Sequence, residues 1–319
     1  MRGLVLALLA APLIAWGQAF PSKPVHLVTE FAAGSTGDVV ARVLASGLRD
    51  SMGQPVIVDN RPGGGGVLAA GQVAHAAPDG YTLLVATTAT QILRIFLAKS
   101  TPFDPVKDFT PVTELGETLT LFVANTSLPV DSLQDLLEYA RRNPGKVAYG
   151  TSGVGSATHL AGEQIRLLTG VPLVHVPYKA VSQALQDVIG GQLPTSFAIL
   201  GLAVPAIRSG KVKALAVVRD TRSPVLPDVP TVAETVKGFE APRNFVGLYA
   251  PARLAPLLLA SVHAHTVKTL SAPEVRERLA QGGFEARFNA TPEDFAAQIG
   301  RQINLVARIV KAAGIQAAE

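Results

Sequence analysis

Short apolar runs alternate with amphipathic stretches along most of this 319-residue chain. Val25–Phe31 is typical of a buried strand, and Asp38–Met52 spaces its apolar residues so that they fall on one helical face. The same alternation predicts strands at Pro55–Asp59, Tyr81–Thr88, Leu121–Asn125, Val147–Thr151, Leu173–Pro177, Ser196–Leu200 and Ala214–Val218, with helices at Ser132–Asn143, Thr158–Thr169, Ser182–Ile189, Pro273–Gln281 and after Thr291. Strands that alternate with helices favour α/β architecture, with parallel sheets covered by helices on both faces.

The N-terminal apolar run decides whether this is a membrane-spanning chain. Gly3–Trp16 spans 14 uncharged residues, whereas a spanning helix needs roughly 20. Arg2 precedes the run, and small residues follow it up to Ala19, which is the order of a secretory signal peptide. We therefore expect residues 1–19 to be a cleaved signal peptide, with an uncleaved anchor as the alternative.

Composition excludes several kinds of site and partner. With no cysteine, the chain has neither disulfides nor a Cys-ligated zinc or iron–sulfur site. The net charge is +4, but lysines and arginines are scattered rather than clustered as a phosphate-tracking surface requires, so no nucleic-acid partner is expected. His263 and His265 lie two apart on an expected helix and point to different faces. We predict no metal site and no cofactor.

Two connections from a strand into a helix carry the residue types of an anion-binding site. They are Phe31–Asp38 and Tyr149–His159, and both combine glycines and small hydroxyls with a helix start. Free backbone amides and the helix dipole favour anions there, and ligands of open α/β sheets bind beyond the carboxyl ends of the strands. The two loops are expected to face each other across a cleft. The alternative is two ordinary capped helix starts.

The sequence contains residues that suggest two rival chemistries. Gly64-x-Gly66-x-x-Ala69 matches the dinucleotide fingerprint formally, but Arg61 and Pro62 separate it from the preceding strand, so the glycines indicate a turn. The Gly-x-Ser-x-Gly motif of secreted hydrolases does not occur. A hydrolase with His159 as its base, acting on a small acid or ester, remains the alternative function.

Ordered segments through nearly the whole chain carry a family resemblance. They are Pro21–Val25, Gly53–Val56, Asn60–Gly63, Ala77–Leu84, Phe103–Phe109, His175–Lys179, Arg222–Pro224, Leu226–Thr231 and Pro273–Arg276. On these segments the chain resembles the Bug (Bordetella uptake gene) family, the solute-binding receptors of tripartite tricarboxylate transporters.

The resemblance implies a periplasmic binding protein of type II-like fold, in which two α/β lobes joined by two crossover hinge strands enclose a ligand cleft. Lobe 1 would comprise residues 20–121 and 242–319, lobe 2 residues 122–241, and the hinge would lie near Leu121–Asn125 and Phe245–Ala250. The implied protein is not an enzyme but a monomeric periplasmic receptor. It would capture a small organic acid and deliver it to a two-component membrane permease by cleft closure. A sensor role for the same receptor is the third reading.

In the family the two loops hold a carboxylate through backbone amides, hydroxyls and bridging waters. The matching ligand-binding positions are Ala33, Gly34, Ser35, Thr36, Gly37 and Asp38 in lobe 1, and Thr151, Ser152, Gly153, Gly155, Ser156, Thr158 and His159 in lobe 2. Thr87 and Thr88 end the third strand, where their hydroxyls would reach the same cleft. Tyr178 and Lys179 end another strand; Lys179 would offer positive charge there, with a solvated lysine as the alternative.

The chain departs from the family pattern at several of these places. Glu30 stands where proline is common, Ser35 replaces a glycine, Ala180 replaces the glycine of Tyr-Lys-Gly, and Pro194 replaces an aspartate. A carboxylate at Glu30 or Asp38 repels an anion unless water or an ammonium group intervenes. An amino acid, an aromatic acid or an amide therefore stays open as ligand beside a plain dicarboxylate.

Overall fold

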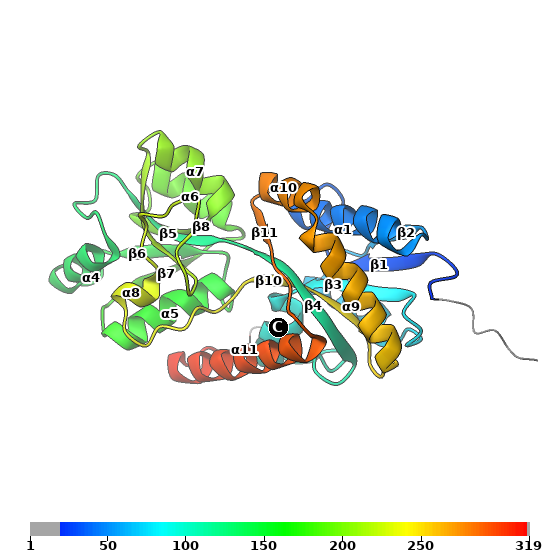
Figure 1. The fold of residues 1–319 in the computed structure, drawn as a ribbon. Coiled ribbons are helices and arrows are strands. Elements are labelled where there is room, and N and C mark those ends of the chain that lie inside the picture. Colours follow the sequence, from blue (N-terminus) through cyan, green and yellow to red (C-terminus); the bar gives the residue numbers. More distant parts are fainter. Residues whose placement is uncertain (1–19, 318–319) are drawn as a thin grey trace, which may run out of the picture.

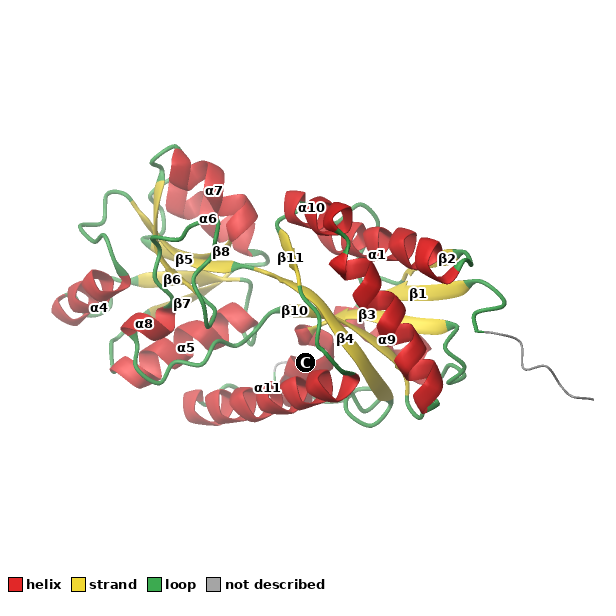
Figure 2. Ribbon diagram, viewed as in Figure 1, coloured by secondary structure: helices red, strands yellow, loops and turns green. Residues whose placement is uncertain are grey.

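The computed structural model describes residues 20–317 and contains two β-sheets that are both flanked by helices (Figures 1 and 2). The predicted signal peptide lies outside the described residues. The six-stranded sheet has the order β11-β4-β10-β3-β1-β2 and the five-stranded sheet the order β7-β6-β8-β5-β9. We call the unit around the first sheet lobe 1 and that around the second lobe 2.

The strands of lobe 1 are β1 (Val25–Thr29), β2 (Val56–Asn60), β3 (Thr82–Thr87), β4 (Phe109–Thr118), β10 (Phe245–Pro251) and β11 (Phe284–Ala286). Those of lobe 2 are β5 (Thr120–Asn125), β6 (Ala148–Thr151), β7 (Val174–Pro177), β8 (Thr195–Ile199) and β9 (Val212–Val217). The expectation of purely parallel sheets is wrong. β10 runs antiparallel to β3 and β4, and β5 runs antiparallel to β8 and β9. The reversal arises because the chain passes from one sheet to the other and back, so the passing strands enter each sheet against its parallel strands.

Helices cover both faces of the lobe 1 sheet. One face carries α1 (Thr36–Met52), α9 (Pro256–Ser271) and α10 (Pro273–Gln281). The other carries η1 (Gly64–Gly66), α2 (Val67–Ala74), the π-helical turn η2 (Ala89–Leu93), α3 (Arg94–Leu97) and α11 (Pro292–Ala313). α1 shows how sequence sets these bounds: Ser35 caps its first turn, and Gly53 ends it in the left-handed conformation that favours glycine.

Lobe 2 is built in the same way. α4 (Leu133–Arg142), α5 (Ala157–Thr169) and α8 (Val232–Thr235) pack on one face of its sheet, and α6 (Val181–Ile189) and α7 (Leu200–Arg208) on the other. Each sheet therefore has one apolar cluster on each of its two faces, which accounts for the high apolar content of a chain with few charges.

The lobes meet at two connections and at several packed contacts. Residue 119 joins β4 to β5, and residues 240–244 lead back to β10. The predicted hinge segments Leu121–Asn125 and Phe245–Ala250 lie in the buried strands β5 and β10, next to these connections. α11 packs against α5, whose Leu160 belongs to the same apolar cluster as the inner side of α11 (Figure 1).

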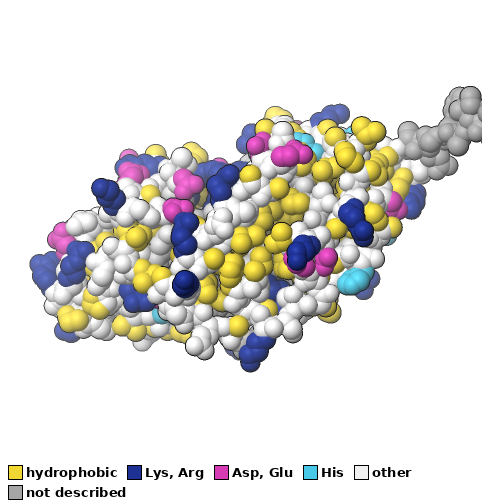
Figure 3. All heavy atoms as spheres, turned by 90° about the horizontal axis from the view of Figure 1, so that it is seen from below, with side chains coloured by type: hydrophobic (Ala, Val, Ile, Leu, Met, Phe, Trp, Pro, Cys, Tyr) yellow, Lys and Arg dark blue, Asp and Glu magenta, His cyan; other side chains and the backbone are white. Residues whose placement is uncertain are grey.

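Between residues 20 and 317, no helix is long and apolar enough to cross a membrane. Figure 3 shows one face of the molecule, with apolar side chains gathered over its middle. Basic side chains lie singly or beside acidic ones on that face rather than in one block.

Candidate functional site

A cavity of about 670 Å³ opens between the two lobes, and we call it the interlobe cavity. Lobe 1 lines it with Gly65, Ala89, Leu93, Arg94, Leu97 and Ala98, and lobe 2 with Ser152, Val154, Gly155, Ser156 and Lys179. Two cationic side chains thus belong to its wall, and among the described lining residues there is no aspartate or glutamate. Such a lining favours an anion.

Most of the lobe 2 wall is the loop between β6 and α5, one of the two loops predicted from the sequence to bind a ligand, and Lys179 completes it. Ser156 is the N-cap of α5: its hydroxyl accepts the backbone N–H of His159 and donates to the carbonyl of Gly153 at 2.8 Å. The backbone N–H of Ser152 donates to the Thr158 hydroxyl at 3.2 Å. These bonds fix a cap of small polar groups at the positive end of a 13-residue helix.

The lobe 1 wall contains residues that were not predicted. Arg94 begins α3 and donates from Nη2 to the carbonyl of Gly64 at 2.6 Å. Gly63, Gly64, Gly65 and Gly66 all have positive φ, so they allow a turn tight enough for this contact. The sequence indicates that turn correctly, but no local periodicity marks Arg94 as facing a ligand.

The predicted first loop faces a second, smaller cavity instead. Thr36 and Gly37 line a space of about 160 Å³ together with Thr87 of β3 and, near the lobe connections, Thr118 and Asn244; Phe31, Val40, Val246 and Phe284 complete its wall. The structure therefore does not place the two loops on one cavity. Ala33 and Gly34 lie exposed beside the first loop's helix cap.

Asp38 holds the first loop together. Its carboxylate accepts the Gly34 N–H at 2.8 Å, the Arg42 Nε–H at 2.9 Å and the Asn60 amide at 2.8 Å. Burial opposes its ionisation, but these bonds outweigh burial and lower the pKa of Asp38 to about 2. The charge of Asp38 is therefore compensated by Arg42 and by hydrogen bonds within the loop, which reduces its repulsion of an anion.

The Glu30 carboxyl bonds residues of β3 and of the π-helical turn η2. Its Oε1 accepts both the backbone N–H and the hydroxyl of Thr87, at 3.1 and 2.6 Å, and its Oε2 bonds the Thr90 hydroxyl. A Cβ on Gly66 would come within 2.3 Å of Glu30 Oε2, so the glycine-rich turn passes directly over the carboxyl. Burial raises the pKa of Glu30. The hydroxyl of Thr87 is engaged by this carboxyl.

Three predicted site residues do not point a free polar group at the interlobe cavity. Thr88 is 1% exposed, and its hydroxyl accepts the N–H and donates to the carbonyl of Phe245. The Tyr178 hydroxyl donates to Asp187 of α6 at 2.7 Å, where burial and this carboxylate raise its pKa to about 12. His159 is 6% exposed, and its Nδ1 accepts the Gly155 N–H. These residues support neighbouring backbone.

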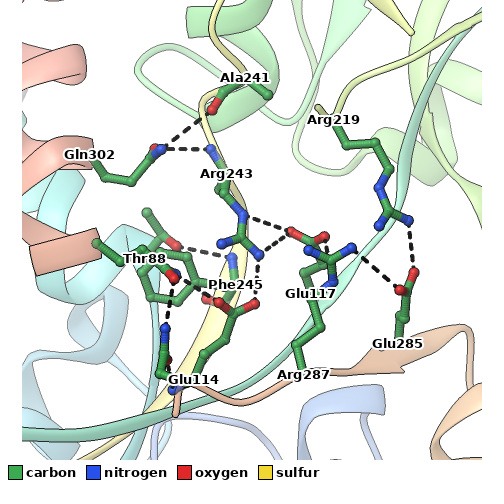
Figure 4. A network of polar contacts seen from close by, with 12 residues as sticks. Thr88, Glu114, Glu117, Arg219, Ala241, Arg243, Phe245, Glu285, Arg287 and Gln302 are labelled. Atoms are coloured by element: carbon green, nitrogen blue, oxygen red, sulfur yellow. Dashed lines mark hydrogen bonds and ion pairs between the residues drawn. The ribbon is translucent and has the colours of Figure 1, made fainter. Parts of the chain in front are cut away.

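An ionic network lies where the lobes join (Figure 4). Arg243, at the end of the returning connection, reaches Glu114 at 2.7 Å and Glu117 at 2.9 Å, both on β4. Arg219, which follows β9 of lobe 2, pairs with Glu285 of β11 in lobe 1 at 2.8 Å. The network therefore ties the connection to the lobe 1 sheet and links one lobe to the other.

Within residues 20–317, no group of three or more His, Cys, Asp or Glu side chains is placed to hold a metal ion.

The model of the tripartite tricarboxylate transporter receptor family matches residues 40–315. The chain belongs to this family. Protein BugT of Bordetella pertussis is 33% identical over 307 residues, covering 96% of this chain and 93% of BugT. A protein from Cupriavidus necator, named for the gbd 5' region, is 36% identical over 280 residues, covering 88% of this chain and 84% of that protein.

Solved structures show the same two-lobed fold. BugD, described as a periplasmic binding protein, is 33% identical, with a TM-score of 0.73 over 94% of this chain and 100% of BugD. MatC of Rhodopseudomonas palustris, solved with bound malate, is 33% identical, with a TM-score of 0.71 over 91% of this chain and 100% of MatC. Rpa4515 of R. palustris, solved with adipate, is 32% identical, with a TM-score of 0.77 over 94% of this chain and 100% of Rpa4515.

These findings confirm the resemblance, the two-lobed α/β fold and the receptor class. The family consists of periplasmic solute-binding receptors, not of enzymes. The comparisons therefore support the receptor and not the alternative function of a secreted hydrolase.

Proposed function

We propose that this receptor captures a small organic acid in the interlobe cavity. The observation that carries the proposal is the lining of that cavity: Arg94 from lobe 1, Lys179 and the capped start of α5 from lobe 2, and no acidic side chain among the described lining residues. Charge-assisted bonds from an arginine and free amides at a helix start are the standard means of holding a carboxylate. MatC with malate and Rpa4515 with adipate support the same ligand class.

Capture works through closure of the lobes. Arg94 and Lys179 belong to different lobes, so a carboxylate that engages both favours the arrangement that brings them together. On the lobe 2 side Ser152 offers a hydroxyl, whereas the Ser156 hydroxyl is used within the helix cap. Thr36 and Gly37 line the smaller cavity, and Ser35 caps the helix beside it. The closed, loaded form is then the one a two-component membrane permease recognises. We also propose that residues 1–19 are removed on export and that the receptor acts as a monomer.

Thermal unfolding of the chain from residue 20, with malate, adipate and amino acids added in turn, tests this proposal. A ligand at 100 times its Kd stabilises the folded state by about 2.7 kcal/mol. Arg94→Met and Lys179→Met should each weaken carboxylate binding, Arg94→Met by about 10-fold or more because a charge-assisted bond is lost. Lys211→Met, at an exposed lysine outside the cavity, is the matched control. If no carboxylate shifts the unfolding curve, or if Lys211→Met weakens binding as much as Arg94→Met, the proposed site is wrong.

A further inference from the structure

Two histidine rings are stacked directly behind the loop that forms the lobe 2 wall of the interlobe cavity. His159 lies in the first turn of α5 and His175 on β7, and their ring centroids are 3.9 Å apart with the planes tilted by 21°. They come from α5 and β7, which follow each other directly in the chain. Neither ring lines the cavity, so the pair acts on a ligand only through the loop.

Each ring holds one point of that loop. His159 Nδ1 lies 3.0 Å from the Gly155 nitrogen, and because a backbone N–H can only donate, Nδ1 carries no proton. His159 is therefore neutral, with its proton on Nε2. His175 Nε2 bonds the Thr151 hydroxyl at 2.7 Å, and that hydroxyl accepts the Gly153 N–H at 3.2 Å. Gly153 and Gly155, the two glycines of the loop, are thus anchored to one ring each.

The surroundings offer little to a charged imidazole. The carboxylate of Glu163 on α5 is an electrostatic neighbour of both rings, but it already accepts the Tyr149 hydroxyl at 2.9 Å and two bonds from Arg166 at 2.9 and 2.6 Å. Tyr149 of β6 lies against the His175 ring, and Arg166 adds a positive charge nearby. Burial, followed by the neighbouring His159, lowers the pKa of His175 to about 4, and burial also lowers the pKa of His159.

We propose that the stacked pair His159–His175 is a proton-controlled support of the ligand loop. While both rings are neutral, they hold Gly153 and Gly155 so that Ser152 and Ser156 face the interlobe cavity. A proton on His159 Nδ1 removes the acceptor of the Gly155 N–H, so two N–H donors then face each other. It also places a positive charge next to the stacked His175 ring. The loop then leaves its place and the ligand is released. As regards the ligand, this inference rests on the proposed function.

The direction of the pH dependence follows from the positions of the two pKa values. Both rings titrate lower in the folded protein than the ordinary value of about 6.5, so the folded loop binds fewer protons than the loosened one. The support is complete above about pH 6.5. It is lost progressively as the pH falls from there toward the lowered values, which for His175 is about 4.

The test replaces both rings by amides that bond at the same place but do not titrate. In His159→Asn the side-chain oxygen stands near the Nδ1 position and still accepts the Gly155 N–H. In His175→Gln the amide reaches the Nε2 position toward Thr151. The double variant keeps both bonds to the loop, and its malate affinity at each pH is the reference for the wild type. The affinity of the wild type, divided by that of the double variant, should fall at least about threefold between pH 7.5 and 5, since one linked proton gives up to tenfold per pH unit. The ratio cancels the ionisation of malate itself.

A ratio that stays constant over this range overturns the proposal. His26→Gln is the matched control, because His26 of β1 bonds Asp59 of β2 in lobe 1, whereas the stacked pair lies in lobe 2. The pH dependence of malate affinity in this variant should follow the wild type. Long-range ¹H–¹⁵N NMR of the ligand-free wild type gives a second readout that needs no variant and no ligand. It should show His159 with the proton on Nε2 at pH 7.5 and a shift of the Gly155 amide as His159 gains a proton. A proton on Nδ1 at pH 7.5 also overturns the proposal. If malate binds at no pH, the proposed ligand class fails while the NMR result still decides the histidine pair.

Discussion

Arg243→Met tests how much the ionic network at the lobe connection contributes to stability. The Arg243 side chain is 15% exposed and compensates Glu114, which is 3% exposed, and Glu117, which is 7% exposed. In the variant, Glu117 would still form an ion pair with Arg287 at 3.3 Å. The carboxylate of Glu114 would retain, among the described residues, only the hydrogen bond from the Gln298 amide. Removing one partner of a buried ion pair leaves an uncompensated charge and costs about 3–5 kcal/mol. With an unfolding entropy of about 2.1 cal/mol/K per residue, that is a fall in Tm of roughly 5–8 °C.

The loss should depend on pH in a defined direction. Burial, together with the nearby Glu117, raises the pKa of Glu114 although Arg243 opposes the rise. Without Arg243 the pKa of Glu114 rises further, so the folded variant takes up a proton that the unfolded chain does not. Its free energy of unfolding therefore recovers relative to wild type as the pH falls, and the deficit is larger at pH 8 than at pH 5.

Urea unfolding followed by circular dichroism at the two pH values measures both effects. Arg308→Met is the matched control, because Arg308 pairs with Glu240 at a similar distance, but the two side chains are 61% and 62% exposed. That exposed pair should contribute 0–1 kcal/mol. A loss below 1 kcal/mol for Arg243→Met at pH 8, or an equal loss at pH 5 and pH 8, would refute the account of the network.

Two further predictions concern contacts between the lobes. A Cβ on Gly155, where φ is +77°, would stand 2.4 Å from Leu97 of lobe 1. Gly155→Ala should therefore lower carboxylate affinity at least about 10-fold, and adding Leu97→Ala should restore part of that affinity. Unchanged affinity of Gly155→Ala in calorimetry would argue against close approach of the lobes. Arg219→Met removes the interlobe pair with Glu285, worth about 1 kcal/mol, so ligand dissociation in stopped flow should be about fivefold faster; a wild-type rate would show that this pair does not hold the lobes together.

Local signals predicted the helices best. Thr291, Pro292 and the acids that follow indicate a helix start, and α11 begins there with Thr291 as N-cap and the reciprocal bonds of a capping box. Ser132 likewise caps α4. These features depend on neighbouring residues only, so they are readable without tertiary structure.

Strand direction and cavity membership were not readable in that way. β10 pairs with β3 and β4 across more than a hundred residues, and no local pattern distinguishes an antiparallel partner from a parallel one. Arg94 reaches the interlobe cavity because the glycine turn at 63–66 and the π-helical turn η2 bring α3 to its wall. The loop before α5 also lines this cavity, and the sequence marks it by glycines, hydroxyls and a helix start that stand together. Glu30 departs visibly from the family pattern, but its bonds to Thr87 and Thr90 depend on the fold.

A crystal structure of the chain from residue 20 grown with malate tests the central claim most directly. The account predicts malate in the interlobe cavity, with one carboxylate within hydrogen-bonding distance of the Arg94 guanidinium or the backbone amides at the start of α5, and Lys179 turned toward it. Malate held in the smaller cavity beside Thr36 and Asn244 alone, with Arg94 still bonded only to Gly64, would contradict it.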